Sequence, residues 1–212
     1  MKRISLTTIS IFGCGWLGLD LARKFLKNDH YIIKGSTTTF EKLAVLEKEK
    51  ILAYIVDTEK NSSLDDFLLC DILIIAIPPK KDNPNYIAFL QKIYNHKKIT
   101  KIQQIIFISS TSIYPKDKKN MTEKEVITYK NCDKKIVFEA EQLFAKHIIL
   151  RCAGLMGYNR VSGQYFANKT IDGRYEQTNY VHVDDVISSI QLIINKQIVK
   201  NIYNLCSPKH PT

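Results

Sequence analysis

Short apolar runs rich in β-branched residues alternate along the chain with stretches whose apolar side chains recur at helical spacing. The apolar runs predict strands at residues 4–12, 31–36, 51–56, 71–77, 101–109, 147–151 and 201–205. The periodic stretches predict helices at residues 16–28, 40–48, 64–69, 86–96, 134–146 and 184–195. This alternation predicts an α/β fold, with a parallel sheet covered by helices on both faces, because the helix between two parallel strands must pack against the sheet.

Two stretches fall outside this rhythm. Residues 115–128 are polar and rich in lysine, which predicts a surface loop. Residues 154–180 carry aromatic residues and glycines without a clear period. Long loops of this kind at strand ends often form one wall of a ligand site. We therefore expect a single domain over residues 1–212, with residues 154–180 as a loop region on the substrate side.

The first predicted strand runs into a glycine-rich turn, Gly13-Cys14-Gly15-Trp16-Leu17-Gly18, which opens a helix. In a G-x-G-x-x-G turn the first glycine makes the bend, the second lets a diphosphate approach the backbone, and the third lets helix and strand pack closely. The helix N-terminus offers free N–H groups and a positive dipole to the phosphates. An ordinary strand-to-helix turn is the alternative, but the strand before and the helix after favour a dinucleotide site.

The end of the second predicted strand bears on the choice between NAD and NADP. An NAD site usually has an acidic residue about 20 positions past the loop, where it binds the ribose 2′-hydroxyl. Here the strand ends in Ser36, Thr37 and Thr38, and Lys34 or Lys42 could bind a 2′-phosphate. This favours NADP over NAD. The choice stays open because arginine, which binds phosphate better, is absent there.

Two further strand ends complete the predicted cofactor site. Asp57 follows residues 51–56, where its carboxylate could bind the adenine amino group or only cap the strand end. Ala76, Ile77 and Pro78 close the fourth predicted strand. Because carboxyl ends of parallel strands meet at one edge of a sheet, we expect these residues beside the glycine loop.

Composition and charge narrow the classes of partner. Hydrophobic residues make up 45% and charged residues 25%, as in globular proteins. No apolar run reaches the roughly 18 residues of a membrane span. The net charge of +10 comes mostly from lysines spread along the chain, without a nucleic-acid-binding motif, so we expect no nucleic-acid partner. The five cysteines lie far apart without a C-x-x-C pair, which predicts neither disulfides nor a metal site and fits a reducing cytoplasm.

The fifth predicted strand ends in Ile108-Ser109-Ser110-Thr111-Ser112-Ile113-Tyr114. With the glycine turn, this segment resembles the extended short-chain dehydrogenase/reductase superfamily, the NAD-dependent epimerase/dehydratase group, and its atypical nucleoside-diphosphate-sugar epimerase-like members. Residues 149–157, 180–186 and 202–205 are similar to later segments of that family. The resemblance implies a Rossmann-type doubly wound sheet, an NAD or NADP cofactor and a small or nucleotide-sugar substrate. It also implies a homodimer through the helices that flank residues 101–109.

The resemblance implies catalytic roles for Ser110 and Tyr114. Ser110 falls at the catalytic Ser/Thr position of the family and would hydrogen-bond the substrate oxygen. The general acid/base of the family is a tyrosine, followed four residues later by a lysine, at the start of the next helix. When Glu141 is aligned on that helix, Asp133 takes the tyrosine position and Val137 takes the lysine position.

This departure leaves two functions open. The first is an NAD(P)-dependent oxidoreductase or epimerase/dehydratase, in which Tyr114, Tyr129 or Asp133 replaces the missing acid/base. The second is a non-catalytic dinucleotide-binding or sensing protein on the same fold. Because the chain stops soon after its last predicted strand, we expect the family's C-terminal substrate domain to be largely absent.

Charged residues of the last third have two interpretations each. Arg160 and Arg174 either bind a phosphate or carboxylate of the substrate or are simply exposed. His182 stands next to Asp184 and Asp185, and we expect one of these two carboxylates to cap the helix at residues 184–195.

Overall fold

The computed structural model of the chain describes residues 6–56, 64–79, 84–116, 120–161, 167 and 177–210. The strands are β1 (Thr7–Phe12), β2 (Tyr31–Thr37), β3 (Leu52–Ile55), β4 (Ile72–Ile75), β5 (Gln104–Ser110), β6 (Ile148–Cys152), β7 (Gly154–Met156), β8 (Tyr180–His182) and β9 (Asn201–Leu205). The helices are α1 (Trp16–Phe25), α2 (Phe40–Lys48), α3 (Tyr86–Tyr94), α4 (Lys135–Leu143) and α5 (Val183–Asn195), with short 3₁₀ turns at Ile99–Lys101 and Thr111–Ile113.

The main sheet has seven strands in the order β3-β2-β1-β4-β5-β6-β9, and every neighbouring pair is parallel. The chain builds outward from β1 to β3 and then returns to the other side of β1 at β4. The order of the strands therefore reverses between β1 and β4, and in such sheets ligands bind outside the carboxyl ends of the strands at the reversal. The predicted doubly wound parallel sheet is confirmed.

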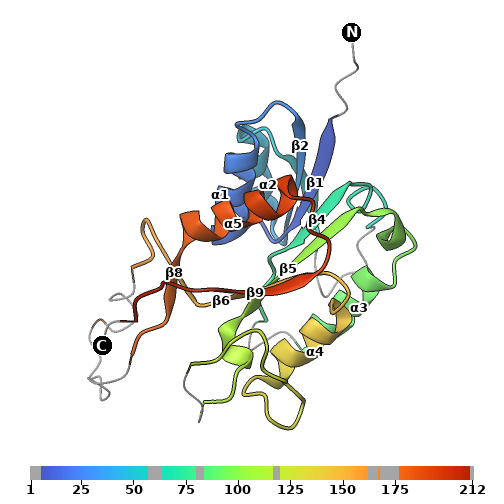
Figure 1. The fold of residues 1–212 in the computed structure, drawn as a ribbon. Helices are drawn as coiled ribbons and strands as arrows, with labels where there is room; N and C mark the ends of the chain where they lie inside the picture. The colour runs from blue at the N-terminus through green and yellow to red at the C-terminus, as the bar shows by residue number, and fades with distance from the viewer. Residues whose placement is uncertain are drawn as a thin grey trace.

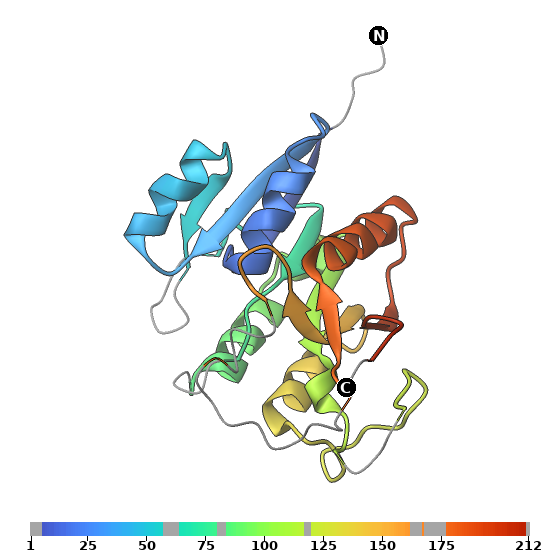
Figure 2. The same ribbon diagram turned by 90° about the vertical axis from the view of Figure 1, so that its left-hand side faces the viewer.

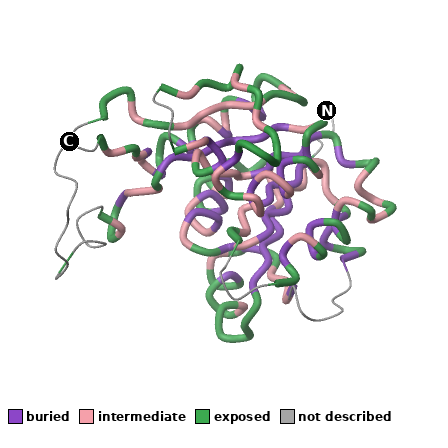
Figure 3. Tube along the Cα trace, turned by 90° about the horizontal axis from the view of Figure 1, so that it is seen from below, coloured by how far each residue is buried: buried purple, intermediate pink, exposed green. Residues whose placement is uncertain are grey.

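Helices cover both faces of the sheet (Figures 1 and 2). On one face, α1, α2 and α5 enclose a core that includes Ile9, Leu21 and Ile190. On the other face, α3 and α4 enclose a second core rich in aromatic rings, among them Phe67 and Phe107. The fully apolar β4 lies between the two cores, and all four of its residues are buried. Buried positions follow the centre of the sheet, and exposed positions follow the surrounding helices and loops (Figure 3).

The spacing of apolar residues explains why α1 forms where it does. Leu17, Leu21 and Phe25 recur on one face and are buried against the sheet, whereas Arg23 lies on the outer face. Gly15 is the N-cap residue and has no side chain that could cap this end of the helix. The N–H groups of the first turn therefore stay available at the carboxyl edge of the sheet.

The predicted helix at residues 64–69 is wrong, because the segment forms turns. One helical hydrogen bond forms, from the N–H of Leu68 to the carbonyl oxygen of Leu64 at 2.9 Å, and side chains from other strands bind the carbonyl groups that follow. Lys34 Nζ lies 2.5 Å from the carbonyl oxygen of Asp66 and 3.2 Å from that of Leu69. Ser10 Oγ donates to the carbonyl oxygen of Phe67 at 2.6 Å. These carbonyl groups are the acceptors through which a helix would continue past this single turn, and the N–H of Asp71 donates to the carbonyl oxygen of Thr8 instead.

The region expected to be a loop at residues 154–180 contains a small second sheet. The short strands β7 and β8 pair in parallel, with Leu155 opposite Val181. Beyond β8, the ring of His182 caps α5, because its Nδ1 accepts a hydrogen bond from the backbone N–H of Asp184 at 3.2 Å. The prediction that Asp184 or Asp185 would be the cap is therefore wrong, since both lie in the first turn.

None of the helices within the described ranges is long and apolar enough to cross a membrane.

Candidate functional site

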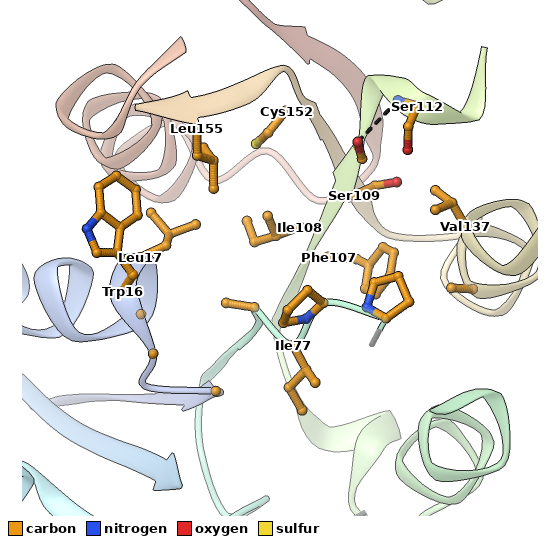
Figure 4. A pocket seen from close by; sticks show the side chains of 18 of the residues that line it. Trp16, Leu17, Ile77, Phe107, Ile108, Ser109, Ser112, Val137, Cys152 and Leu155 are labelled. Atoms are coloured by element: carbon orange, nitrogen blue, oxygen red, sulfur yellow. Dashed lines mark hydrogen bonds between the residues drawn. The ribbon is translucent and has the colours of Figure 1, made fainter. Parts of the chain in front are cut away.

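A cavity of about 470 Å³ opens at the carboxyl edge of the sheet, where the strand order reverses. Its walls come from the glycine turn, the ends of β4, β5 and β6, the start of β7, and α4. In Figure 4, Trp16 and Leu17 lie on one side, Ser109 and Val137 lie on the other, and Ile108 lies between them. The lining residues are Gly13, Gly15, Trp16, Leu17, Gly18, Ala76, Ile77, Pro78, Pro79, Tyr86, Phe107, Ile108, Ser109, Ser110, Ser112, Val137, Ala140, Cys152, Ala153, Leu155 and Arg160.

The glycine turn is held against the neighbouring strands by its backbone. The N–H of Gly13 donates to Ser36 Oγ at 2.9 Å, and the N–H of Cys14 donates to the carbonyl oxygen of Ser36 at 2.8 Å. Gly13 has a φ of +85°, in the left-handed region that favours glycine. A Cβ on Gly13 would lie only 3.0 Å from the carbonyl oxygen of Ala76, so β4 leaves no room for a side chain there.

Gly15 and Gly18 serve different purposes. A Cβ on Gly18 would overlap the carbonyl oxygen of Gly13, so only glycine lets α1 pack this closely on the turn. A Cβ on Gly15 would meet no heavy atom within 4 Å, because this position faces the open cavity. Gly15 therefore leaves the backbone accessible from the cavity, whereas Gly18 is required by packing.

The strand end after β2 is only partly available to a ligand. Ser36 and Thr37 are buried beneath the glycine turn, and Thr38 is exposed. Lys34 is also buried, and its Nζ faces the carbonyl groups of residues 66 and 69. The expectation that Lys34 could bind a 2′-phosphate is therefore wrong, whereas Lys42 on α2 is exposed. Asp57 lies outside the described residues.

The end of β5 brings three serine side chains to the cavity. Ser110 Oγ accepts a hydrogen bond from the N–H of Ser112 at 3.1 Å and caps the 3₁₀ turn that follows. Its hydroxyl proton can therefore be donated to a ligand. Ser109 Oγ lies 2.5 Å from Glu141 Oε1 on α4. The sequence prediction named Ser110 but neither Ser109 nor Ser112.

Tyr114 is not among the described residues that line the cavity. Its hydroxyl accepts a hydrogen bond from Arg151 Nη1 at 3.0 Å and lies 2.8 Å from Asn204 Oδ1. The ring stands beside the guanidinium of Arg151, whose central carbon lies 5.0 Å from the ring centroid. The hydroxyl thus belongs to a polar cluster that joins the end of β5 to β6 and β9. The catalytic role of Tyr114 stays a prediction.

The other expected substitutes for the acid/base also lie away from the lining residues that the structure describes. Asp133 faces Lys116 and Lys134, with carboxylate–ammonium distances of 3.6 Å and 3.7 Å. Tyr129 is exposed and stacks under the ammonium group of Lys135. In their place, α4 presents the apolar side chains of Val137 and Ala140 to the cavity.

Three titratable side chains are among the described residues that line the cavity. Burial raises the pKa of Tyr86 far above its usual range, and its hydroxyl donates to the carbonyl oxygen of Ile77 at 3.1 Å. Burial raises the pKa of Cys152 to about 12, so its thiol is neutral at pH 7. Arg160 supplies a positive charge. The side-chain chemistry offered by these walls is therefore hydroxyl hydrogen bonding and one cation.

Arg160 lies over the indole ring of Trp16 at the rim of the cavity. The central carbon of its guanidinium is 5.1 Å from the ring centroid, within the range of cation–π contacts. Trp16 Nε1 in turn donates to Asn159 Oδ1 at 3.2 Å. The turn after β7 is thereby joined to the first residue of α1, although more than a hundred residues separate them in the sequence.

Several lining residues had no place in the predicted site. Cys152 ends β6 and Ala153 follows it, whereas Leu155 on β7 falls within residues 154–180, the region expected on the substrate side. For Cys152 and Ala153 the available signal is their position at the end of the strand beside β5, because neighbouring parallel strands end at the same sheet edge. The described part of the chain holds no group of three or more His, Cys, Asp or Glu residues arranged for a metal ion.

Comparison with known proteins places this geometry in context. No known family profile matches the chain. It is 31% identical to Protein YeeZ of Escherichia coli strain K12, over 96% of this chain and 78% of that protein. Its fold is similar to that of UDP-glucuronic acid 4-epimerase from Bacillus cereus, solved with UDP-glucuronic acid and NAD, with a TM-score of 0.76, 20% identity, and coverage of 96% of this chain and 78% of the epimerase. It is also similar to dTDP-glucose 4,6-dehydratase from Bacillus anthracis, solved with NAD, with a TM-score of 0.72, 14% identity, and coverage of 97% and 77%.

Proposed function

This chain belongs to the family of Protein YeeZ and has the fold of the extended short-chain dehydrogenase/reductases, and on that basis we propose that it binds NADP or NAD at the glycine turn. We further propose that it acts as an oxidoreductase or epimerase/dehydratase on a small or nucleotide-sugar substrate. The cavity would hold the nicotinamide and the reacting part of the substrate. The solved epimerase and dehydratase of similar fold, both described as complexes with NAD, support this choice of ligand.

The observation that carries the proposal is the open space at Gly15. The backbone of the turn faces the cavity there, and the uncapped first turn of α1 adds free N–H groups. A diphosphate needs both features, because its oxygens must approach the backbone and accept hydrogen bonds from it. Ala76 and Ile77, just after β4, line the same cavity beside the glycine turn.

On the substrate side, the chain offers serine hydroxyls. Ser110 would donate to an oxygen of the substrate, since its Oγ already accepts from the N–H of Ser112. The apolar walls made by Phe107, Val137 and Leu155 would exclude water from the reacting carbon. A bound nicotinamide would supply hydride transfer at its C4 atom.

A second function, binding or sensing a dinucleotide without turnover, is favoured by one specific observation. In the alignment on Glu141, Val137 and Asp133 take the positions of the catalytic lysine and tyrosine, and in the structure Val137 lines the cavity while Asp133 faces two lysines. A positioned acid/base is typically worth about 10²- to 10⁴-fold in rate. A protein that lacks this pair would keep its dinucleotide affinity but turn over slowly or not at all.

For the dinucleotide itself, we propose a preference for NADP over NAD. The end of β2 carries hydroxyl groups where an NAD site usually has a carboxylate. The exposed Lys42 on α2 adds a cation near that end of the strand, and Thr38 adds an exposed hydroxyl. Equal or tighter binding of NAD⁺ would contradict this preference.

Calorimetric titration of the purified chain with NADP⁺ and NAD⁺ in parallel tests the binding proposal. Micromolar binding of either one supports it, and the Gly15→Val variant should then bind neither. If wild-type protein binds neither dinucleotide, the proposal fails. A screen of nucleotide sugars with the bound dinucleotide, followed by nicotinamide absorbance and by product analysis, then separates an enzyme from a sensor.

The cytoplasmic location and the homodimer stay predictions, and size-exclusion chromatography with light scattering tests the second.

A further inference from the structure

We propose that Arg160 is a diphosphate ligand which closes over the glycine turn from the opposite side of the cavity, with Trp16 as its platform. The inference rests on the proposed dinucleotide binding and extends it to a residue outside the glycine turn. It gives the turn at residues 157–160, which follows β7, a direct part in binding a phosphorylated ligand.

The first observation is that the turn bearing Arg160 is held at both ends. Gly157 and Arg160 form an antiparallel bridge, with N–H to carbonyl distances of 3.0 Å and 2.8 Å. Between them, the hydroxyl of Tyr158 donates to Asp184 Oδ1 at 2.7 Å, and its ring meets that of His182 edge-on. The turn is thereby anchored to β8 and to the first turn of α5. Arg160 therefore projects from a fixed base.

The second observation is the contact of this turn with α1. The guanidinium of Arg160 stacks over Trp16, and the same indole donates to Asn159. Trp16 directly follows Gly15, the position that faces open space. The stacking therefore holds the guanidinium next to the part of the turn that a diphosphate would approach. Arginine suits this task, because its planar fork can stack on a ring and still donate several hydrogen bonds to phosphate oxygens.

The third observation is the charge distribution. Among the described residues that line the cavity, Arg160 is the charged one, and the others are apolar or carry neutral polar groups. The first turn of α1 contains no acidic residue. An anion in this part of the cavity would therefore be attracted by the guanidinium and by the positive end of the α1 dipole.

The test measures diphosphate affinity in the full chain, with matched arginine variants. ADP-ribose supplies the diphosphate of the dinucleotide, and UDP, titrated into protein saturated with NADP⁺ or NAD⁺, supplies that of a nucleotide-sugar substrate. We expect Arg160→Gln to lower the affinity for one of these two ligands about tenfold, because one charge-assisted hydrogen bond is lost. Arg160→Lys should lower that affinity less. Weaker ADP-ribose binding assigns Arg160 to the cofactor, and weaker UDP binding alone assigns it to the substrate.

The control is Arg23→Gln, which removes one arginine charge from the outer face of α1, the helix that carries Trp16, where Arg23 pairs with Asp20 and Glu49. It should leave both affinities within about twofold of wild type, since exposed pairs contribute little at a distance. The affinity for the affected ligand should also depend less on salt concentration in Arg160→Gln than in Arg23→Gln. Equal thermal midpoints establish that both variants are folded.

The sole tryptophan of the chain, Trp16, gives a second readout. In wild-type protein its emission should change on titration with ADP-ribose or UDP, and Arg160→Gln should shift the midpoint of that change by the same factor as in calorimetry. Tight wild-type binding with unchanged affinities in Arg160→Gln would overturn this inference and leave the proposed function intact. Absence of all binding in wild-type protein would overturn the proposed function as well.

Discussion

Arg151 binds the carboxylate of Glu141 through two nitrogens, with Nη2 2.7 Å from Oε2 and Nε 3.0 Å from Oε1. The pair joins β6 to α4, and both side chains are buried, with exposed fractions of 5% and 3%. Glu141 also accepts from Ser109, which lines the cavity, and Arg151 donates to Tyr114. One ion pair thus fixes the helix, two strand ends and one wall of the site.

The first prediction concerns that ion pair. Arg151→Leu should lower the free energy of unfolding by about 3–5 kcal/mol, because it leaves the Glu141 carboxylate buried without its partner. The double variant Glu141→Leu/Arg151→Leu should be more stable than this single variant, since no unpaired charge remains. Urea unfolding followed by circular dichroism measures both. A double variant less stable than Arg151→Leu would show that the pair is not the source of the loss.

The glycine turn separates binding from folding. Gly15→Val should abolish measurable dinucleotide binding, because its side chain would fill the space that a diphosphate needs, and it should leave the thermal midpoint unchanged. Gly18→Ala should instead lower stability by roughly 2 kcal/mol or more, because its methyl group would overlap the carbonyl oxygen of Gly13. Calorimetric titration and thermal unfolding of the two variants should give opposite patterns. Identical patterns would contradict the division of roles.

Ser110→Ala tests the catalytic interpretation. An enzyme should lose turnover by about 10²-fold or more, because the substrate oxygen loses its hydrogen-bond donor, and should keep its dinucleotide affinity. Since the same hydroxyl caps the 3₁₀ turn at Ser112, Ser110→Thr serves as the conservative control and should restore most of the rate. Full turnover in Ser110→Ala would remove Ser110 from the mechanism.

Thr38→Asp tests the choice of dinucleotide. A carboxylate placed on the exposed residue after β2 would accept from a ribose 2′-hydroxyl and repel a 2′-phosphate, so the ratio of NAD⁺ to NADP⁺ affinity should rise about tenfold or more. Parallel titrations of wild type and variant measure this ratio. Thr38→Asn, which has nearly the same shape without the charge, should change the ratio much less.

Two buried thiols predict a loss of stability in alkali. Burial raises the pKa of Cys14 and of Cys152 from 9.0 to about 12. Their stabilising contribution is fully present below the unfolded pKa and falls as pH rises from about 9 towards 12, because the unfolded chain then loses protons that the folded chain retains. Between about pH 8 and about pH 10, each thiol should remove roughly 1 kcal/mol from the free energy of unfolding. Urea unfolding at both pH values measures the change. Cys152→Ala should reduce it, and Cys206→Ser, at an exposed position, should not.

Most helices and strands could be predicted because their signal is local. The buried face of α1 follows helical spacing, and β4 is a continuous apolar run, so the burial of each element is predicted by its own residues. The segment at residues 64–69 has similar spacing, but Lys34 on β2 and Ser10 on β1 donate hydrogen bonds to its carbonyl groups. No property of the segment itself indicates those hydrogen bonds. The strands β7 and β8 are too short to show a period.

The site could be predicted where a backbone conformation demands one residue type. The three glycines and the end of β4 line the cavity as expected, because a sharp turn and close packing require glycine. The direction of a polar side chain is not encoded in this way. Lys34 lies one residue from Gly35 in the same strand, yet its ammonium group is taken by carbonyl groups in the core. Tyr114 similarly finds its partner in Arg151, which only the packed sheet brings near.

The order of the strands also constrains how the chain can fold. β1 precedes the other described strands in sequence but lies between β2 and β4 in the sheet, with β2 paired to it early and β4 arriving only after β3. During synthesis on a ribosome, the backbone N–H and C=O groups along one edge of β1 therefore stay unpaired until residues near Ile72 have emerged. Such delayed long-range pairing slows folding and leaves exposed a strand edge that can pair with another chain. The nascent chain is thus most vulnerable to association with other chains during that interval, before the two halves of the sheet meet where the ligand cavity will form.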